Sequence, residues 1–143
     1  MRSLGRTASV LGLFVSLVVL TGCSDGPKIV SVSGTLTREG KPVPNLTINF
    51  VPAVGRPSWA VSDENGRFTA QYDKAQEGVI VGTHTVWVVW RPSSPKEEMD
   101  IQSGKASRPA NYKAITEKFG SEEKTPLKFE ITKAESNLEI KLD

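Results

Sequence analysis

The chain has one cysteine and one histidine among its 143 residues. A single cysteine, Cys23, cannot form an intramolecular disulfide, so stability must come from packing. Zinc sites take three or four protein ligands, and Cys23 with His84 supplies no such set. A hydrolytic triad needs a nucleophile, a base and an orienting group at one point, and His84 has no sequence-level partner of these kinds. We therefore expect no metal, no other cofactor and no enzymatic activity.

The sequence also has little excess of charge of either sign. The formal net charge is +2, and Arg2 and Arg6 near the N-terminus account for all of it. The other charges are scattered along the chain rather than clustered, unlike those of a nucleic-acid-binding protein. The sequence also shows no glycine-rich phosphate loop and no paired-carboxylate spacing. We therefore expect no nucleic-acid partner.

What the sequence does contain is an N-terminal leader. Arg2 and Arg6 form a basic region without acids, and the apolar run 8–20 follows it. This run is too short for an ordinary membrane-spanning helix, and its flanks fit a secretory signal. We expect a signal peptide helix over residues 1–22. An ordinary cleaved signal peptide and an uncleaved anchor are the alternatives.

The leader ends in a motif that contains the single cysteine. Leu20, Thr21, Gly22 and Cys23 resemble the lipobox of bacterial lipoproteins, which the lipoprotein signal peptidase recognises. The resemblance implies that Cys23 carries a diacylglycerol on sulfur, becomes the first residue and is acylated, for example with palmitate, on its new amine. It implies a membrane-anchored protein of the cell envelope that faces the periplasm. Ser24 follows in place of Asp, which favours the outer membrane over the inner one.

These signals divide the chain into three segments. Residues 1–22 form the signal peptide, 23–28 form a lipidated tether, and 29–143 form one β-sandwich domain of ordinary size. The tether is too short to hold the domain far from the bilayer. Within the domain, residues 92–126 interrupt the strand pattern and are expected to form an insertion.

Seven segments of the domain are predicted strands, and most of them alternate apolar and polar residues as half-buried strands do. They are 29–37, 43–51, 57–62, 67–72, 82–91, 127–132 and 136–142. We expect 29–37 to pair with 43–51, 67–72 to return along 57–62, and 127–132 to pair with 136–142. The expected fold is all-β, a seven-stranded sandwich of immunoglobulin or transthyretin-like type.

Segment 82–91 is the most apolar of the seven. Both of its faces are largely apolar or β-branched, which predicts a central strand that is covered on both faces. In the insertion, Tyr112, Ile115 and Phe119 are spaced like one face of a helix. We expect a short helix over 109–120 that lies on the sandwich, after a polar, flexible stretch.

Four short motifs resemble the carboxypeptidase regulatory-like family. They are Val-Ser-Gly-Thr-Leu at 32–36, Gly-Lys-Pro-Val-Pro-Asn at 40–45, Asp-Glu-Asn-Gly-Arg-Phe at 63–68 and Gly-Thr-His-Thr-Val at 82–86. The match runs from Ile29 to about Arg91 and implies a transthyretin-like, non-catalytic accessory module. It departs from the family at His84, where the family usually has Tyr, and in having Val81 before Gly82. The region after Pro109 is similar to small lipoproteins of planctomycete-like bacteria.

Two polar features have a functional and a structural interpretation. His84 is either a catalytic base or a half-buried histidine whose ring bonds a backbone group, and we expect the second. The stretch 63–66 is either a calcium loop or a turn. It lacks the spaced acids and the distal Glu of an EF-hand, so we expect a turn.

The aromatic residues Trp59, Trp87, Trp90 and Tyr112 are the candidate binding surface. They could stack on sugar rings or anchor an envelope protein. Alternatively, Trp87 or Trp90 lies in the core and the other packs beneath Tyr112 and Phe119. We expect a lipid-anchored, non-enzymatic envelope module with a binding or structural role. The alternative is an accessory protein or enzyme that acts on envelope polysaccharide or peptide.

Overall fold

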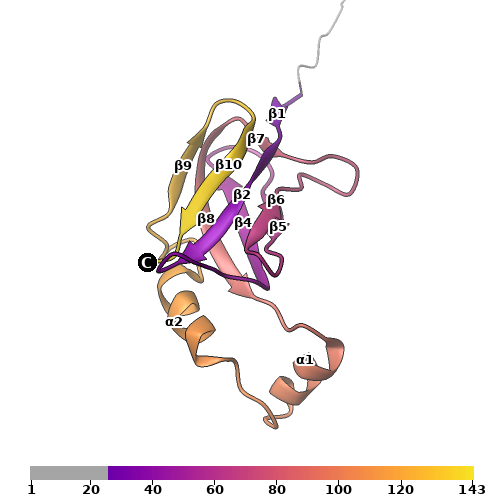
Figure 1. Cartoon of the computed structure of the whole chain (residues 1–143). Helices are drawn as coiled ribbons and strands as arrows, with labels where there is room; N and C mark the ends of the chain where they lie inside the picture. The colour runs from indigo at the N-terminus through magenta and orange to yellow at the C-terminus, as the bar shows by residue number, and fades with distance from the viewer. Residues whose placement is uncertain (1–25) are drawn as a thin grey trace, which may run out of the picture.

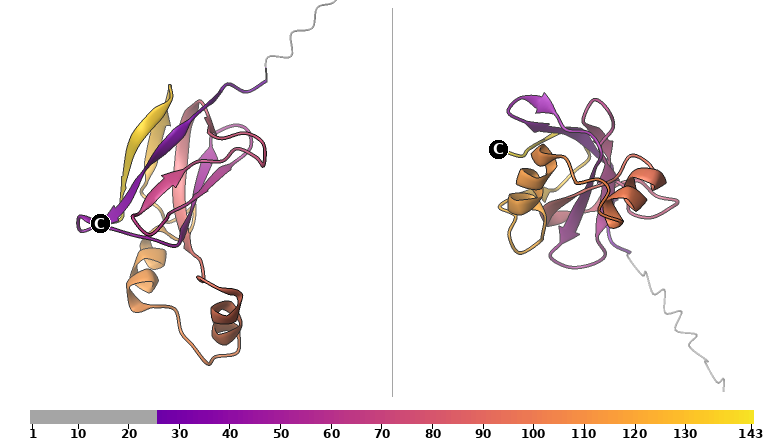
Figure 2. Two further views of the ribbon diagram at one scale, coloured as in Figure 1. Left: turned by 45° about the vertical axis from the view of Figure 1, so that its right-hand side comes forward. Right: turned by 90° about the horizontal axis from the view of Figure 1, so that it is seen from below.

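The computed structural model describes residues 26–143, which are mostly β-strand and include two short helices. The predicted signal peptide helix, the lipobox and Cys23 lie outside the described residues. Two four-stranded sheets face one another, an arrangement consistent with the predicted sandwich. Both helices lie beyond one end of the sheets, opposite the end at which the described chain begins (Figures 1 and 2).

Ten strands and two helices are present within this range. They are β1 (Ile29–Val30), β2 (Val32–Arg38), β3 (Lys41–Pro42), β4 (Leu46–Pro52), β5 (Ser58–Val61), β6 (Arg67–Thr69), β7 (Val79–Ile80), β8 (Gly82–Trp90), α1 (Pro95–Gln102), α2 (Ala110–Phe119), β9 (Lys128–Ile131) and β10 (Glu135–Lys141). Each of the seven predicted segments contains at least one strand. The two-residue strands β3 and β7 lie outside those segments.

The first sheet is built around β2. β10 runs parallel to β2 along one edge, and β3 and β6 pair antiparallel with successive parts of the other edge. The register of β10 on β2 shifts between Glu135 and Leu138. At this irregularity a Cβ on Gly34 would lie 1.9 Å from the carbonyl oxygen of Leu138. The close approach of the two backbones therefore requires glycine at position 34.

The second sheet has the strand order β5-β4-β8-β9, and all of its pairs are antiparallel. The prediction that segment 82–91 forms a central strand is confirmed, because β8 lies between β4 and β9. β1 and β7 form a separate two-stranded ladder. The alternation in β4 buries Leu46, Ile48 and Phe50 on one face. The ring of Phe50 lies 6.0 Å from that of Phe68 on β6, so the two sheets share one core.

The predicted pairings of 29–37 with 43–51 and of 127–132 with 136–142 are wrong, because the two main strands of each pair belong to different sheets. β2 and β4 do not pair: the chain crosses between the sheets near Asn45, whose φ is 57° and whose N–H donates to the Ser62 carbonyl. β9 pairs with β8, and β10 pairs with β2. Alternation identifies the apolar face of a strand but not its neighbour, and crossing between sheets keeps every apolar face on the shared core.

The predicted turn at 63–66 is confirmed, although it also connects the two sheets. Asp63 Oδ1 accepts the backbone N–H groups of Asn65 and Arg67, each at 2.8 Å. Gly66 has φ 70° and donates its N–H to the Asp63 carbonyl. The strand that follows, β6, pairs with β2, so the prediction that segment 67–72 returns along 57–62 holds only past the end of β6. There Gln71 and Trp59 form an antiparallel bridge through two backbone hydrogen bonds, of 3.0 and 2.7 Å.

The prediction that both faces of β8 are covered is also wrong. His84, Val86, Val88 and Trp90 are buried, whereas the alternate residues are half-buried or exposed. Valine and threonine are frequent on a solvent-facing sheet surface because their branched side chains fit a pleated strand. The apolar composition of the outer face therefore does not indicate a second core.

The helix predicted within the insertion is confirmed. α2 buries Tyr112, Ile115 and Phe119. α1 was not expected in the polar stretch before it, and none of its side chains is buried. Its signal resembles a capping box: Ser94 Oγ at the N-cap accepts the N–H of Glu97, and Glu97 Oε2 accepts the N–H of Ser93, one residue before the N-cap. Within residues 26–143, neither helix has the length and apolar character needed to cross a membrane.

Candidate functional site

The four candidate aromatic residues divide into two pairs with different surroundings. Trp90 and Tyr112 are only 7% and 8% exposed, and their rings lie 5.9 Å apart. The Tyr112 hydroxyl donates to the Pro44 carbonyl at 3.0 Å. Burial and, to a smaller extent, the negative charge of Glu97 raise the pKa of Tyr112 above its ordinary value. This inner pair is the packing contact that holds α2 against the end of the sheets.

Trp59 and Trp87 form a second pair on the outer face of the second sheet. Asn49 of β4 is in register with Trp59 of β5 on one side and with Trp87 of β8 on the other. The three side chains therefore form one row across three strands. Two interstrand spacings separate the two indoles, a distance of about 10 Å.

A second row extends this outer surface. Thr47 is in register with Val61 and Val89, which are 42% and 39% exposed. A shallow pocket of about 470 Å³ spans the two rows. It is lined by Thr47, Asn49, Trp59, Trp87, Val89 and Arg91. We call these six residues the tryptophan face.

The tryptophan face combines three kinds of chemistry. The indoles offer flat apolar surfaces, Asn49 and Thr47 offer a side-chain amide and a hydroxyl, and Arg91 offers a guanidinium. The buried indole N–H of Trp87 has no acceptor in the described part of the chain. Flat apolar rings beside short polar groups suit a ligand that is itself amphipathic and flat.

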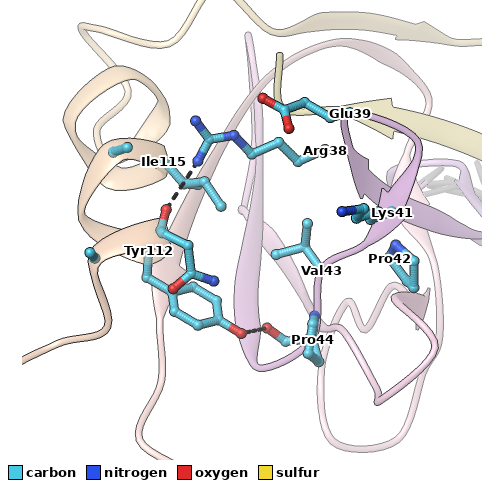
Figure 3. Close-up of a pocket in the computed structure, with 11 residues that line it drawn as sticks. Arg38, Glu39, Lys41, Pro42, Val43, Pro44, Tyr112 and Ile115 are labelled. Atoms are coloured by element: carbon cyan, nitrogen blue, oxygen red, sulfur yellow. Dashed lines mark hydrogen bonds between the residues drawn. The ribbon is translucent and has the colours of Figure 1, made fainter.

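A deeper pocket of about 540 Å³ lies between α2 and the turn that joins β2 to β3 (Figure 3). Its walls include Val43 and Ile115. Arg38 donates across it to the Asn111 carbonyl at 3.1 Å, and Tyr112 closes its lower side through the bond to Pro44. Sequence reasoning missed this pocket because the turn and α2 are far apart in the chain. These two hydrogen bonds hold α2 against the sheets, so we interpret the pocket as part of this packing contact.

His84 lies in the interior. Its side chain is 0% exposed, and its Nε2 donates to the Ile80 carbonyl at 2.7 Å. The ring packs edge-on against Phe50, with centroids 6.3 Å apart. The predicted bond to a backbone group is confirmed, but the ring is fully buried rather than half-buried. A base in this position has no access to a substrate.

The other polar candidate is the turn at 63–66, whose carboxylate is used within the turn itself. Asp63 Oδ1, the carboxylate oxygen expected in a calcium loop, accepts two backbone N–H groups within its own turn. Among residues 26–143, no cluster of three or more His, Cys, Asp or Glu residues is arranged to hold a metal ion.

No protein-family model matches this chain, and neither a curated protein nor a solved structure is significantly similar to it. The resemblances to lipoproteins and to the carboxypeptidase regulatory-like family therefore stay predictions.

Proposed function

We propose that this chain is a lipid-anchored, non-enzymatic binding module of a bacterial cell envelope. In this proposal, the lipid on Cys23 attaches the protein to the membrane, and the folded domain binds a partner. The observation that carries the proposal is the position of the lipobox relative to the fold. Only residues 24–28 separate Cys23 from the first strand, which begins at Ile29.

The point at which the chain enters the domain supports an orientation at the membrane. The described chain begins at the end of the sheets opposite α1 and α2 (Figures 1 and 2). Five extended residues reach at most about 18 Å. A lipid on Cys23 would therefore hold the β1 end close to the bilayer, with the helices directed away from it and the tryptophan face on one side.

The tryptophan face supports a binding role over a purely structural one. It presents two indoles and a guanidinium on an open sheet surface instead of in the core. The burial of His84 removes the only histidine from contact with substrates. These two observations favour binding over hydrolysis.

We further propose that the fold is of the transthyretin-like type implied by the family resemblance. Two of the motifs that resemble the family have a structural explanation in this fold. Gly34 lies where the β10 backbone leaves no space for a side chain, and Asp63 and Gly66 build the turn between the sheets. These residues support the fold and do not identify a ligand.

The anchor is tested by metabolic labelling with a palmitate analogue in a bacterial host. We expect the wild-type chain to incorporate the label and Cys23→Ala to incorporate none. Washing membranes with about 1 M salt, where the Debye length is ~3 Å, should leave the wild-type protein bound, whereas detergent should release it. Equal labelling of both chains, or a mature N-terminus at Ser24 or beyond, would contradict the proposal.

A further inference from the structure

The tryptophan face is an apolar surface that the described chain leaves open. Scattered exposed hydrophobic residues are ordinary in folded proteins, but contiguous ones mark interaction sites. Here Trp87 and Val89 are neighbours on the outer face of β8, and Trp59 and Val61 lie on the outer face of β5, with Asn49 and Thr47 of β4 between the two strands. The surface is therefore a candidate interaction site, and its polar and charged groups indicate the chemistry of a partner.

The charges at the face favour an anionic partner. Arg91 lines the pocket, and no acidic residue does. Lys128 lies further along the same outer surface, where its Nζ donates to Thr85 Oγ1 at 3.2 Å. Three acids lie around the face but outside the pocket. Glu77 follows Gln71 in the row of Trp59 and accepts from the Gln71 amide at 3.4 Å, Glu130 pairs with Thr83 beyond Lys128, and Asp63 Oδ1 accepts two backbone N–H groups. A second copy of this face would offer Arg91 no acidic partner from the residues that line the pocket.

The arrangement of the row favours a flat, extended ligand. The indoles lie about 10 Å apart across a sheet surface, which is close to the length of a disaccharide unit. Asn49 lies between them, where it can bond the hydroxyl groups of a ring that bridges the two stacking positions. A protein partner would bury such a row with an apolar core and few central polar groups.

We propose that the tryptophan face binds a linear polysaccharide that carries carboxylates, a polyuronate chain. Trp59 and Trp87 stack on two of its sugar rings, Asn49 and Thr47 bond hydroxyl groups between them, and Arg91 pairs with a carboxylate. This inference rests on the proposed binding role but not on the lipid anchor, so the anchor can fail while the face still binds.

The test is a calorimetric titration of the full chain, purified in detergent, with hexasaccharides of polygalacturonate and of alginate. We expect saturable binding of at least one of them. Trp59→Ala and Trp87→Ala should each weaken it by roughly tenfold, as for the loss of one aromatic contact. Trp59→Phe keeps a stacking ring and should retain most of the affinity.

The contribution of charge is tested with a matched ligand and a matched variant. The methyl ester of the same hexasaccharide should bind more weakly to the wild type. Arg91→Gln should weaken binding of the acid but not of the ester. Lys128→Gln removes a charge from the same sheet surface outside the pocket and should change the affinity by less than Arg91→Gln does.

Four outcomes would overturn the inference. They are failure of both hexasaccharides to bind, full affinity in Trp59→Ala and Trp87→Ala that melt like the wild type, equal binding of ester and acid, and a dimer that Trp59→Ala dissociates. The last outcome would assign the face to a second copy of the chain. Cleavage of the hexasaccharide would instead overturn the non-enzymatic function, whereas a wild-type chain labelled no more than Cys23→Ala would overturn only the anchor.

Discussion

Trp87 and Trp90 are three residues apart on the same strand, and they have opposite environments. Successive side chains of a strand point to opposite faces, so Trp90 enters the interior with Val86 and Val88 while Trp87 lies outside. Trp90 packs on Tyr112 of α2, and Trp87 shares an open row with Trp59. The inner pair has its partner within the chain, whereas the outer pair lines an open pocket, for which we propose a ligand. Position on the strand, rather than residue type, separates the buried tryptophan from the one on the outer face.

The largest effect that separates the two pairs is expected in Trp90→Ala. Removing a buried tryptophan takes away its apolar contacts and leaves a cavity, so the free energy of unfolding should fall by about 3–5 kcal/mol. Trp87→Ala should lose clearly less, because Trp87 is only half-buried. Denaturant melts of both variants measure this difference. Equal losses would mean that the outer tryptophan is also a core residue.

A smaller effect is expected in Tyr112→Phe. The variant keeps the ring on Trp90 but loses the hydrogen bond to the Pro44 carbonyl, which should cost about 0.5–1.5 kcal/mol. Tyr112→Ala, which also removes the ring, serves as the comparison and should lose more. If Tyr112→Phe is as stable as the wild type, the bond does not help to hold α2.

Tyr112 should also make the free energy of unfolding depend on pH. The pKa of Tyr112 is raised in the folded state from its ordinary value of 10.0, mainly by burial. The folded state therefore holds this proton more tightly than the unfolded state does, and the resulting stability is complete below pH 10. It is lost as the pH rises through the folded-state pKa. Melts in that alkaline range should show a steeper loss for the wild type than for Tyr112→Phe, and parallel curves would contradict the assignment.

The smallest effect on stability is expected in Trp59→Ala. Trp59 is a half-buried residue of the edge strand β5, on the outer face of its sheet. Surface substitutions usually change stability by no more than about 0.5 kcal/mol, so this variant should melt close to the wild type. A loss of stability comparable to that of Trp90→Ala would contradict the distinction between the buried pair, Trp90 and Tyr112, and the outer pair.

In this chain, the sequence predicts which face of an element is buried better than it predicts which strands pair. The alternation of Leu46, Ile48 and Phe50 and the helical spacing of Tyr112, Ile115 and Phe119 were enough to identify the buried sides of β4 and α2. Both patterns are local, because one face of one element has to be apolar. Strand partners depend on where the chain crosses between sheets, and apolar periodicity carries no information about that crossing.

The candidate site shows the same limit. The four aromatic residues could be selected from the sequence, and the alternation along segment 82–91 already placed Trp87 and Trp90 on opposite faces. Which face is covered depends on the first sheet, which shares its core with Val86 and Val88, and on α2, which lies against Trp90 through Tyr112. The row that Asn49 forms with Trp59 and Trp87 depends on the register of three strands. Neither relation can be read from one segment alone.

The most direct test of the contrast is residue-resolved oxidative footprinting of the full chain, with and without the polygalacturonate or alginate hexasaccharide. Without ligand, Trp59 and Trp87 should be modified faster than Trp90 and Tyr112. With saturating ligand, modification of the outer pair should slow while that of the inner pair stays low and unchanged. Modification of Trp90 as fast as that of Trp59, or a ligand that leaves the outer pair as reactive as before, would contradict the account.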